Sequence, residues 1–433
     1  MFLFSDQGNT QAHSKDPIMN RRITFTATII LLFVFGSCQK TPPPQEGIWN
    51  GTIALADQKQ LPFQVYLNLN PAAASGYFIN GSEQTAIPEL YVRGDSLEIQ
   101  ISEYGAAMHA VWNGKSYSGE FLRYRKDTTR NSFELMPAAA AVGSSEKKSV
   151  SEIPLVGKFQ VLIKNAEGID SSRVATFWSR SDSVFGTFIA SDGDYGLMAG
   201  VHSGNAVRLG RFSGWQAQLM ELSRTENHWT GTLTYRAPPV VTFELVPRPN
   251  AAVEVPEAKR PVMKDPRKPF AFSGLSVFGD TVRASDPKFK GKALIVDIMG
   301  TLCHNCMSAT PLLQKLSSDF ASQGLEVFAL SFEITDDPQL ARKNLLLYQE
   351  RHGVGFSVLY CGSTERSNVD QKIRSQINNF SAYPTTLFID RKGLVQNIHE
   401  GFKGPGTGEE YQSQVELYYS LTRKLLGKQS ASR

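Results

Sequence analysis

Two cysteines, Cys303 and Cys306, are the residues whose type and spacing most clearly indicate chemistry in this sequence. They follow an apolar run, residues 293–299, which predicts a buried strand, and they would stand at the start of the next helix. Backbone N–H groups and the helix dipole at such a position stabilise a thiolate and lower a cysteine pKa below its usual ~8.5. We therefore predict that Cys303 is a nucleophile in thiol–disulfide exchange. Cys306, about one helical turn further along, would resolve the intermediate.

The same Cys-x-x-Cys spacing also occurs as half of many zinc sites, but zinc needs two further ligands. The remaining candidate ligands are scattered and form no second close pair. They are Cys361, His304, His352 and His399. A purely structural disulfide is disfavoured because so short a loop constrains the unfolded chain little. We predict a redox-active disulfide between the two cysteines, with no metal and no other cofactor, and expect Cys361 to be an inert core thiol rather than a third redox partner.

The segment from 270 to 433 predicts strands that alternate with helices and end in a hairpin and a last helix. The expected elements are a helix with Leu312, Leu313, Leu316 and Phe320 on one face, a strand at 325–332, a helix at 338–351, a strand at 357–360, a helix marked by Val369, Ile373, Ile377 and Phe380, a hairpin of 385–389 and 394–399, and a helix at 409–426.

This segment resembles the thioredoxin superfamily, specifically the membrane-anchored thiol–disulfide oxidoreductases of the TlpA/ResA type. The resemblance rests on Lys290-Gly291-Lys292, Asp297, the Cys303-His-Asn-Cys306 motif, Pro311, and the run from Ala382 to Gly393 that contains Tyr383-Pro384. It implies an α/β thioredoxin-like domain and a protein-disulfide oxidoreductase activity.

The resemblance also implies roles for residues around the cysteines. Pro384 would follow a cis peptide bond beside the cysteine pair, and the backbone of Tyr383 would bind the substrate chain. Asp297 matches the buried acid of thioredoxin, whose raised pKa lets it take a proton from the resolving thiol. His304 and Asn305 would tune the redox pair. A partly cationic His304 would make the pair a stronger oxidant, whereas the alternative is a solvated spectator.

Three positions depart from the family pattern. Leu302 replaces the tryptophan that usually precedes the first cysteine, Met299 replaces an aromatic residue, and Ala309 replaces a glutamate that TlpA/ResA-type proteins often carry. This sequence therefore keeps one proton acceptor, Asp297, and loses another.

The N-terminus predicts export and a lipid anchor. Residues 1–37 read as a bacterial signal peptide, with Met19 as a possible true start, because an apolar run at 23–36 is too short to span a bilayer. The small residues before Cys38 resemble a lipobox, which predicts lipidation of Cys38, and 38–46 would be a tether. The alternative is an uncleaved signal anchor with an incidental cysteine.

Between the tether and the redox segment, short alternating apolar segments and turn signals predict all-β structure. Two modules, 47–140 and 152–249, share an internal repeat. Residues 250–269, rich in proline and charge, read as a linker. The repeated aromatic residues either form a ligand surface or, as we expect from their alternation, belong to the core. They are Trp49, Phe78 and Tyr117, with the counterparts Phe159, Phe188 and Trp229.

The predicted fold class is thus a multidomain chain. It consists of two N-terminal all-β antiparallel modules, each a sandwich or small barrel, followed by a C-terminal α/β thioredoxin-like domain at 270–433. The net charge of +4 is small and little clustered, which argues against a nucleic-acid partner. Expected partners are protein thiols and disulfides, a membrane thiol donor, and the membrane itself through the lipid anchor.

The sequence predicts a lipid-anchored thiol–disulfide oxidoreductase of the bacterial cell envelope, facing the periplasm or the outside, which reduces protein disulfides. An oxidase or isomerase direction stays open because of His304. The alternative is an envelope binding or assembly protein in which the β modules are the functional part and the redox domain is accessory. A peroxidase of the peroxiredoxin type is disfavoured, since its Pro-x-x-x-Thr/Ser-x-x-Cys pattern is absent before Cys303.

Overall fold

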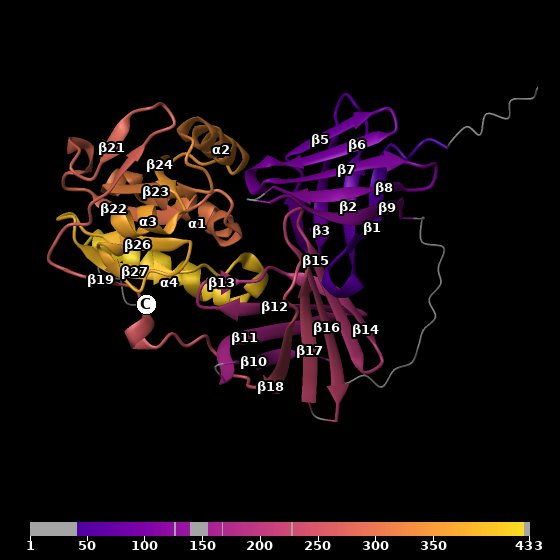
Figure 1. Cartoon of the computed structure of the whole chain (residues 1–433). Coiled ribbons are helices and arrows are strands. Elements are labelled where there is room, and N and C mark those ends of the chain that lie inside the picture. Colours follow the sequence, from indigo (N-terminus) through magenta and orange to yellow (C-terminus); the bar gives the residue numbers. More distant parts are fainter. Residues whose placement is uncertain (1–40, 125–126, 139–154, 167, 227, 428–433) are drawn as a thin grey trace, which may run out of the picture. The chain divides into compact units, whose positions relative to one another are not determined.

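The computed structural model describes residues 41–124, 127–138, 155–166, 168–226 and 228–427 (Figure 1). The predicted signal peptide and the lipidation site Cys38 lie outside these residues. Within the described ranges, no helix is long and apolar enough to cross a membrane.

The first β region is a nine-stranded antiparallel sheet with the order β4-β3-β2-β1-β9-β8-β7-β6-β5. Its side chains alternate: Trp49 and Ile53 of β1 are fully buried, while Asn50 and Thr52 between them are exposed. The strands are β1 (Glu46–Ala54), β2 (Gln60–Asn68), β3 (Ser75–Asn80), β4 (Glu83–Ala86), β5 (Glu89–Arg93), β6 (Ser96–Ile101), β7 (Ala106–Trp112), β8 (Tyr117–Arg123) and β9 (Thr129–Pro137).

The second β region is a closed barrel of eight strands (Figure 1). The long strand β11 pairs with β10 on one side and with β12 on the other, and β12 also pairs with β14, which completes the ring. Closure leaves the barrel itself without a free edge strand. The strands are β10 (Gly157–Asn165), β11 (Gly168–Arg180), β12 (Ser183–Ala190), β13 (Gly193–Asp194), β14 (Met198–Ser203), β15 (Ala206–Phe212), β16 (Ala217–Thr225), β17 (His228–Tyr235) and β18 (Val241–Pro247).

The two β regions have the same strand order. In the first sheet β3-β2-β1-β9-β8-β7-β6-β5 corresponds to β12-β11-β10-β18-β17-β16-β15-β14 of the barrel, which is the arrangement that the internal repeat requires. The six repeated aromatic side chains are all buried, so the expectation that they belong to the core is confirmed. The predicted domain boundaries themselves stay predictions.

The C-terminal region is a seven-stranded mixed sheet with the order β21-β20-β24-β23-β22-β26-β27. Helices α1, α2 and α4 pack on one face of this sheet, and the segment around α3 packs on the other. The elements are β20 (Ser273–Leu275), β21 (Thr281–Arg283), β22 (Ala293–Met299), α1 (His304–Phe320), β23 (Leu325–Glu333), α2 (Pro338–Arg351), β24 (Ser357–Ser363), α3 (Arg366–Val369), β26 (Thr385–Ile389), β27 (Val395–Glu400) and α4 (Glu409–Leu425).

The first sheet and the barrel share a hydrophobic core. Phe212, at the end of β15, is fully buried among the aromatic rings of the first sheet, with its centroid 4.5 Å from Phe63 and 5.0 Å from Phe78. The buried Asn80 side chain bridges the same point. It accepts the Phe212 N–H and donates to the Phe212 carbonyl, both at 3.0 Å.

The predicted fold class, a multidomain chain of two separate β modules and an α/β domain, is wrong. Residues 41–433 form one compact unit that is largely β-structure, with four α-helices among the described residues. One β region is a closed barrel, the other is an open sheet, and Phe212 joins their cores. Alternation within a strand shows which side chains turn inward, but it does not show that two inward faces meet.

The helix predicted across Val369 to Phe380 is too long. Helix α3 continues only as a π-helical turn to Arg374, and Ile377–Asn378 then forms strand β25, which pairs with β19 (Val262–Met263). Asn379 adopts a left-handed φ of 58° that a helix does not continue through. Its side chain donates to the carbonyls of Ala258 and Arg260, at 2.8 and 3.0 Å.

We predict that Phe212→Ala lowers the free energy of unfolding by about 3–5 kcal/mol, because it opens a cavity in the shared core. Urea denaturation followed by circular dichroism measures this change. Phe278→Ala is the matched control, since Phe278 is 85% exposed and its loss should change stability by no more than about 0.5 kcal/mol. Equal, small effects of the two substitutions would show that Phe212 does not join the cores.

Candidate redox site

Cys303 and Cys306 form a disulfide at the junction of β22 and α1, with 5.2 Å between their Cα atoms. Cys303 is the N-cap residue of α1, and its Sγ accepts the backbone N–H of Cys306 at 3.2 Å. Cys306 is fully buried, whereas Cys303 is partly exposed. The strand-to-helix position predicted for the pair is therefore confirmed. Once reduced, the Cys303 sulfur would be the more accessible and the better stabilised as a thiolate.

A buried glutamate that sequence reasoning missed holds the turn before the cysteines. Glu333, at the end of β23, accepts the Thr301 N–H at 3.1 Å and the Thr301 hydroxyl at 2.6 Å, and Ser331 also donates to it. Its side chain is 1% exposed. The sequence does show an acidic residue directly after the apolar run 325–332. It does not show the partner, because Thr301 follows a different strand, β22. Glu333 thus fixes the backbone from which Cys303 starts the helix.

Asp297 lies fully inside the sheet, as predicted. It is 1% exposed and accepts the Thr386 hydroxyl at 2.7 Å, and the Tyr418 hydroxyl in turn donates to Thr386 at 3.0 Å. Burial raises the pKa of Asp297 to about 7, although the hydrogen bond from Thr386 opposes the rise. A carboxyl group with this pKa can accept and release a proton near neutral pH.

The loop predicted to bind substrate lies against the disulfide. The Tyr383–Pro384 peptide bond is cis, as predicted, and the Tyr383 carbonyl oxygen is 3.5 Å from Cys303 Sγ. The Tyr383 ring packs at 5.6 Å from Phe380 and 6.2 Å from Phe332. The structure therefore brings together Cys303, Tyr383 and Pro384. Their function in substrate binding stays a prediction.

His304 is half-buried and packs against the barrel. Its ring centroid is 5.7 Å from that of Trp215. Burial lowers the pKa of His304, and the nearby positive charge of Arg211 lowers it further. The carboxylates of Asp194 and Glu83 oppose this shift, and the net lowering of the pKa favours the neutral imidazole over the partly cationic ring that the sequence suggested. Sequence reasoning could not detect this, because Arg211 comes from a distant part of the chain.

The barrel contacts the surface around the cysteines directly. Asn305 donates to the carbonyl of Asp192 at 2.9 Å, and Gly193 forms a parallel bridge with Phe402. The Asp194 carboxylate accepts the Gly404 N–H at 2.5 Å. At Gly193, with φ +126°, a side chain would meet the Asn305 amide at 2.1 Å. Asn305 therefore holds a tight contact between α1 and the barrel.

Other candidate groups do not extend the redox site. Cys361 is buried and free, and burial raises its pKa to about 12, so the expected inert core thiol is confirmed. In the part of the chain that the structure describes, no three His, Cys, Asp or Glu side chains gather as a metal ion would require. Cys38 lies outside the described residues.

Known proteins are similar to about a third of this chain. No family model matches the chain. The thioredoxin-like protein YneN of Bacillus subtilis is 27% identical over 146 residues, which are 34% of this chain and 75% of that protein. The thiol-disulfide oxidoreductase ResA of the same species is 26% identical over 145 residues, 34% of this chain and 68% of that protein. ResA of Halalkalibacterium halodurans is 23% identical over 134 residues, 30% of this chain and 65% of that protein.

Among solved structures, a thiol:disulfide interchange protein of the thioredoxin family from Chlorobium tepidum is similar over 37% of this chain and 97% of its own length. Its sequence identity is 22% and its TM-score is 0.27. These similarities each cover about a third of the chain.

We predict that the pKa of Asp297 makes stability depend on pH. Folding raises this pKa from 3.8 to about 7, so the folded protein holds the proton more tightly, and wild type loses stability as pH rises from about 4 to about 7. Asp297→Asn does not titrate and should lack this loss. Urea unfolding across that range measures the difference, with Asp280→Asn at an exposed turn as the matched control. Parallel stability curves for wild type and Asp297→Asn would contradict the prediction.

Proposed function

On the premise that its C-terminal third is homologous to thioredoxin-like thiol–disulfide oxidoreductases, we propose that this protein reduces disulfides of protein substrates through Cys303 and Cys306. The homologues confirm the predicted family resemblance and enzyme class. The observation that carries the proposal is the disulfide itself, with Cys303 as the N-cap of α1 beside the cis-Pro384 loop.

The reaction starts from the reduced pair. The Cys303 thiolate, stabilised by the Cys306 N–H, attacks one sulfur of the substrate disulfide, and the other sulfur leaves as a thiolate. The Cys306 thiol gives its proton to Asp297 and attacks Cys303 Sγ. This step releases the second substrate sulfur and forms the Cys303–Cys306 disulfide. The substrate gains two electrons and two protons, and a dithiol donor then reduces the protein again.

The neutral state of His304 supports the reductase direction. A cationic imidazole beside the thiolate would stabilise the reduced pair and make it oxidising. Burial and Arg211 lower the pKa of His304, which removes this stabilisation at neutral pH. Asp297, with a pKa of about 7, supports the same direction because it can take the proton of the resolving thiol.

We expect Cys306→Ser to accumulate mixed disulfides between Cys303 and protein substrates, because the resolving sulfur is missing. Non-reducing electrophoresis, with and without a thiol reductant, detects these adducts. Insulin reduction should be lost in both Cys303→Ser and Cys306→Ser, and kept in the control Cys361→Ser, since Cys361 is buried. Adducts on Cys303→Ser instead would assign the nucleophile to Cys306.

We also propose that Cys38 carries a lipid that anchors the protein on the outer side of a bacterial membrane. The support is the short apolar run at 23–36 and the small residues directly before Cys38. A membrane thiol donor would then supply the electrons that regenerate Cys303 and Cys306. Such a donor fits an exchange site that works outside the cytoplasm.

Cys38→Ser should leave the protein unprocessed or mislocalised, because the lipidated residue is missing. Cell fractionation and metabolic labelling with a fatty acid measure this outcome in cells that express the full chain. Ser37→Ala, next to the cysteine, is the matched control and should be labelled like wild type. A Cys38→Ser protein that matures and fractionates with membranes as wild type does would contradict the anchor.

A further inference from the structure

A cavity of about 730 Å³ adjoins the redox helix α1. His304, Met307, Ser308 and Pro311 line it from α1, at positions i, i+3, i+4 and i+7 that share one helix face. His304 directly follows the nucleophile Cys303 in the chain. An occupant of the cavity would therefore contact the first two turns of the helix whose N-cap is Cys303.

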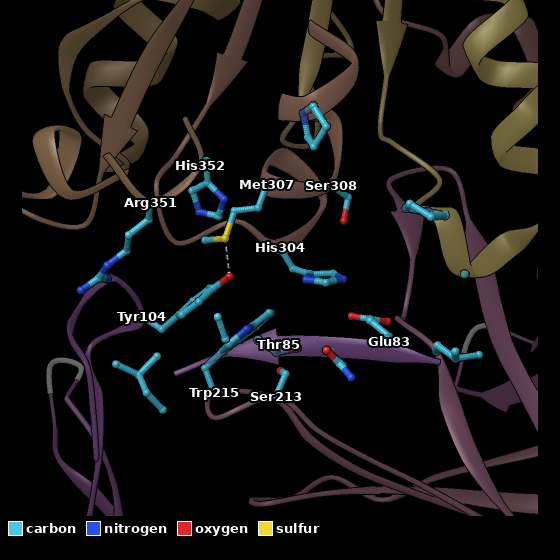
Figure 2. A pocket seen from close by; sticks show the side chains of 18 of the residues that line it. Glu83, Thr85, Tyr104, Ser213, Trp215, His304, Met307, Ser308, Arg351 and His352 are labelled. Atoms are coloured by element: carbon cyan, nitrogen blue, oxygen red, sulfur yellow. Dashed lines mark hydrogen bonds between the residues drawn. The ribbon is translucent and has the colours of Figure 1, made fainter. Parts of the chain in front are cut away.

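The other walls of the cavity come from the first sheet, the barrel, the end of α2 and residues 404–406. Tyr104 and Trp215 stack with 4.6 Å between their ring centroids and an interplanar angle of 8°. Figure 2 shows these two rings below His304, with the Tyr104 hydroxyl donating to the Met307 sulfur. Strand β4 adds Thr85 to the lining. The cavity thus has aromatic and thioether walls.

The charged groups around the cavity are paired. Glu83 binds Arg211 through two bonds of 2.7 and 2.9 Å. Arg351 binds Glu89 at 3.2 Å. Asp194 accepts two backbone N–H groups. Because these charges are already paired within the protein, the cavity favours an uncharged occupant over an ion.

The two imidazoles that line the cavity are also neutral at pH 7. Burial lowers the pKa of His352, and the neighbouring Arg351 lowers it further. Burial and the positive charge of Arg211 likewise lower the pKa of His304. The lining therefore presents aromatic, thioether and polar groups, together with charged groups that are already paired within the protein.

We propose that this cavity is a specificity pocket that takes a bulky apolar side chain next to the cysteine of a disulfide-bonded polypeptide substrate. The inference rests on the proposed function. The volume of the cavity lies in the usual range for ligand pockets, and the apolar part of its walls matches an apolar side chain. The first sheet and the barrel then have a defined role, because they select which protein disulfide reaches Cys303.

The test compares two disulfide-bonded peptides that differ in one residue beside a cysteine, leucine in one and serine in the other. Wild type should reduce the leucine peptide with a kcat/KM about tenfold higher, since the fit of an apolar side chain in a pocket gives differences of roughly that size. Oxidised glutathione serves as a small disulfide that does not reach the pocket.

Thr85→Trp fills the cavity from β4 and should abolish the preference for leucine, while kcat/KM for the serine peptide and oxidised glutathione stays unchanged. Thr225→Trp, at the exposed end of β16 away from the cavity, is the matched control and should keep the preference. Unfolding of Thr85→Trp would leave the wild-type comparison as the deciding measurement.

The outcomes separate the two proposals. A wild-type protein that reduces both peptides equally, or a Thr85→Trp variant that keeps the preference, would overturn the pocket and leave the proposed function in place. Equal loss on all three substrates in Thr85→Trp would also overturn it, since the substitution would then act on the redox pair. A wild-type protein that reduces no disulfide would overturn the proposed function and the pocket with it.

Discussion

The hydrogen bond from the Cys306 N–H to Cys303 Sγ is the interaction on which this site depends. It requires that β22 end, and α1 begin, with Cys303 at the N-cap, where unpaired backbone donors and the helix dipole favour a thiolate. Glu333 holds the preceding turn by accepting both donors of Thr301. The same geometry leaves Cys303 partly exposed and Cys306 fully buried. The two sulfurs therefore differ in accessibility: Cys303 can be reached by a substrate, and Cys306 is shielded.

A second constraint comes from the contacts between α1 and the β regions. The residues between the cysteines are half-buried: His304 lies against Trp215, and Asn305 donates to the Asp192 carbonyl. Burial lowers the pKa of His304, and Arg211, which pairs with Glu83, lowers it further. The β regions therefore form part of the setting of the redox pair.

The sequence predicted those features that depend on neighbouring residues. Helix α2 begins and ends where expected, at Pro338 and Arg351, because a proline start and apolar spacing mark it. The cis bond before Pro384 followed from the family resemblance. The local motif also placed Cys303 at the start of a helix.

The features that the sequence did not predict arise from residues far apart in the chain. Closure of the barrel needs the pairing of β10 with β18, and the shared core needs Phe212 to enter the first sheet. The helix expected to reach Phe380 ends early because Asn379 binds backbone carbonyls more than 110 residues away. The lowered pKa of His304 comes first from its burial and then from Arg211, which lies about 90 residues away in the chain. Periodicity describes one element at a time and contains no information on such pairings.

The central claim is that the position of Cys303 at the N-cap makes it the nucleophile. The most direct measurement is the rate of alkylation of each cysteine in the reduced full chain across a range of pH, followed by mass spectrometry of the labelled peptides. The account predicts that Cys303 reacts faster than Cys306, with an apparent pKa below the ~8.5 of a free cysteine. Faster alkylation of Cys306, or a Cys303 pKa at or above that value, would contradict it.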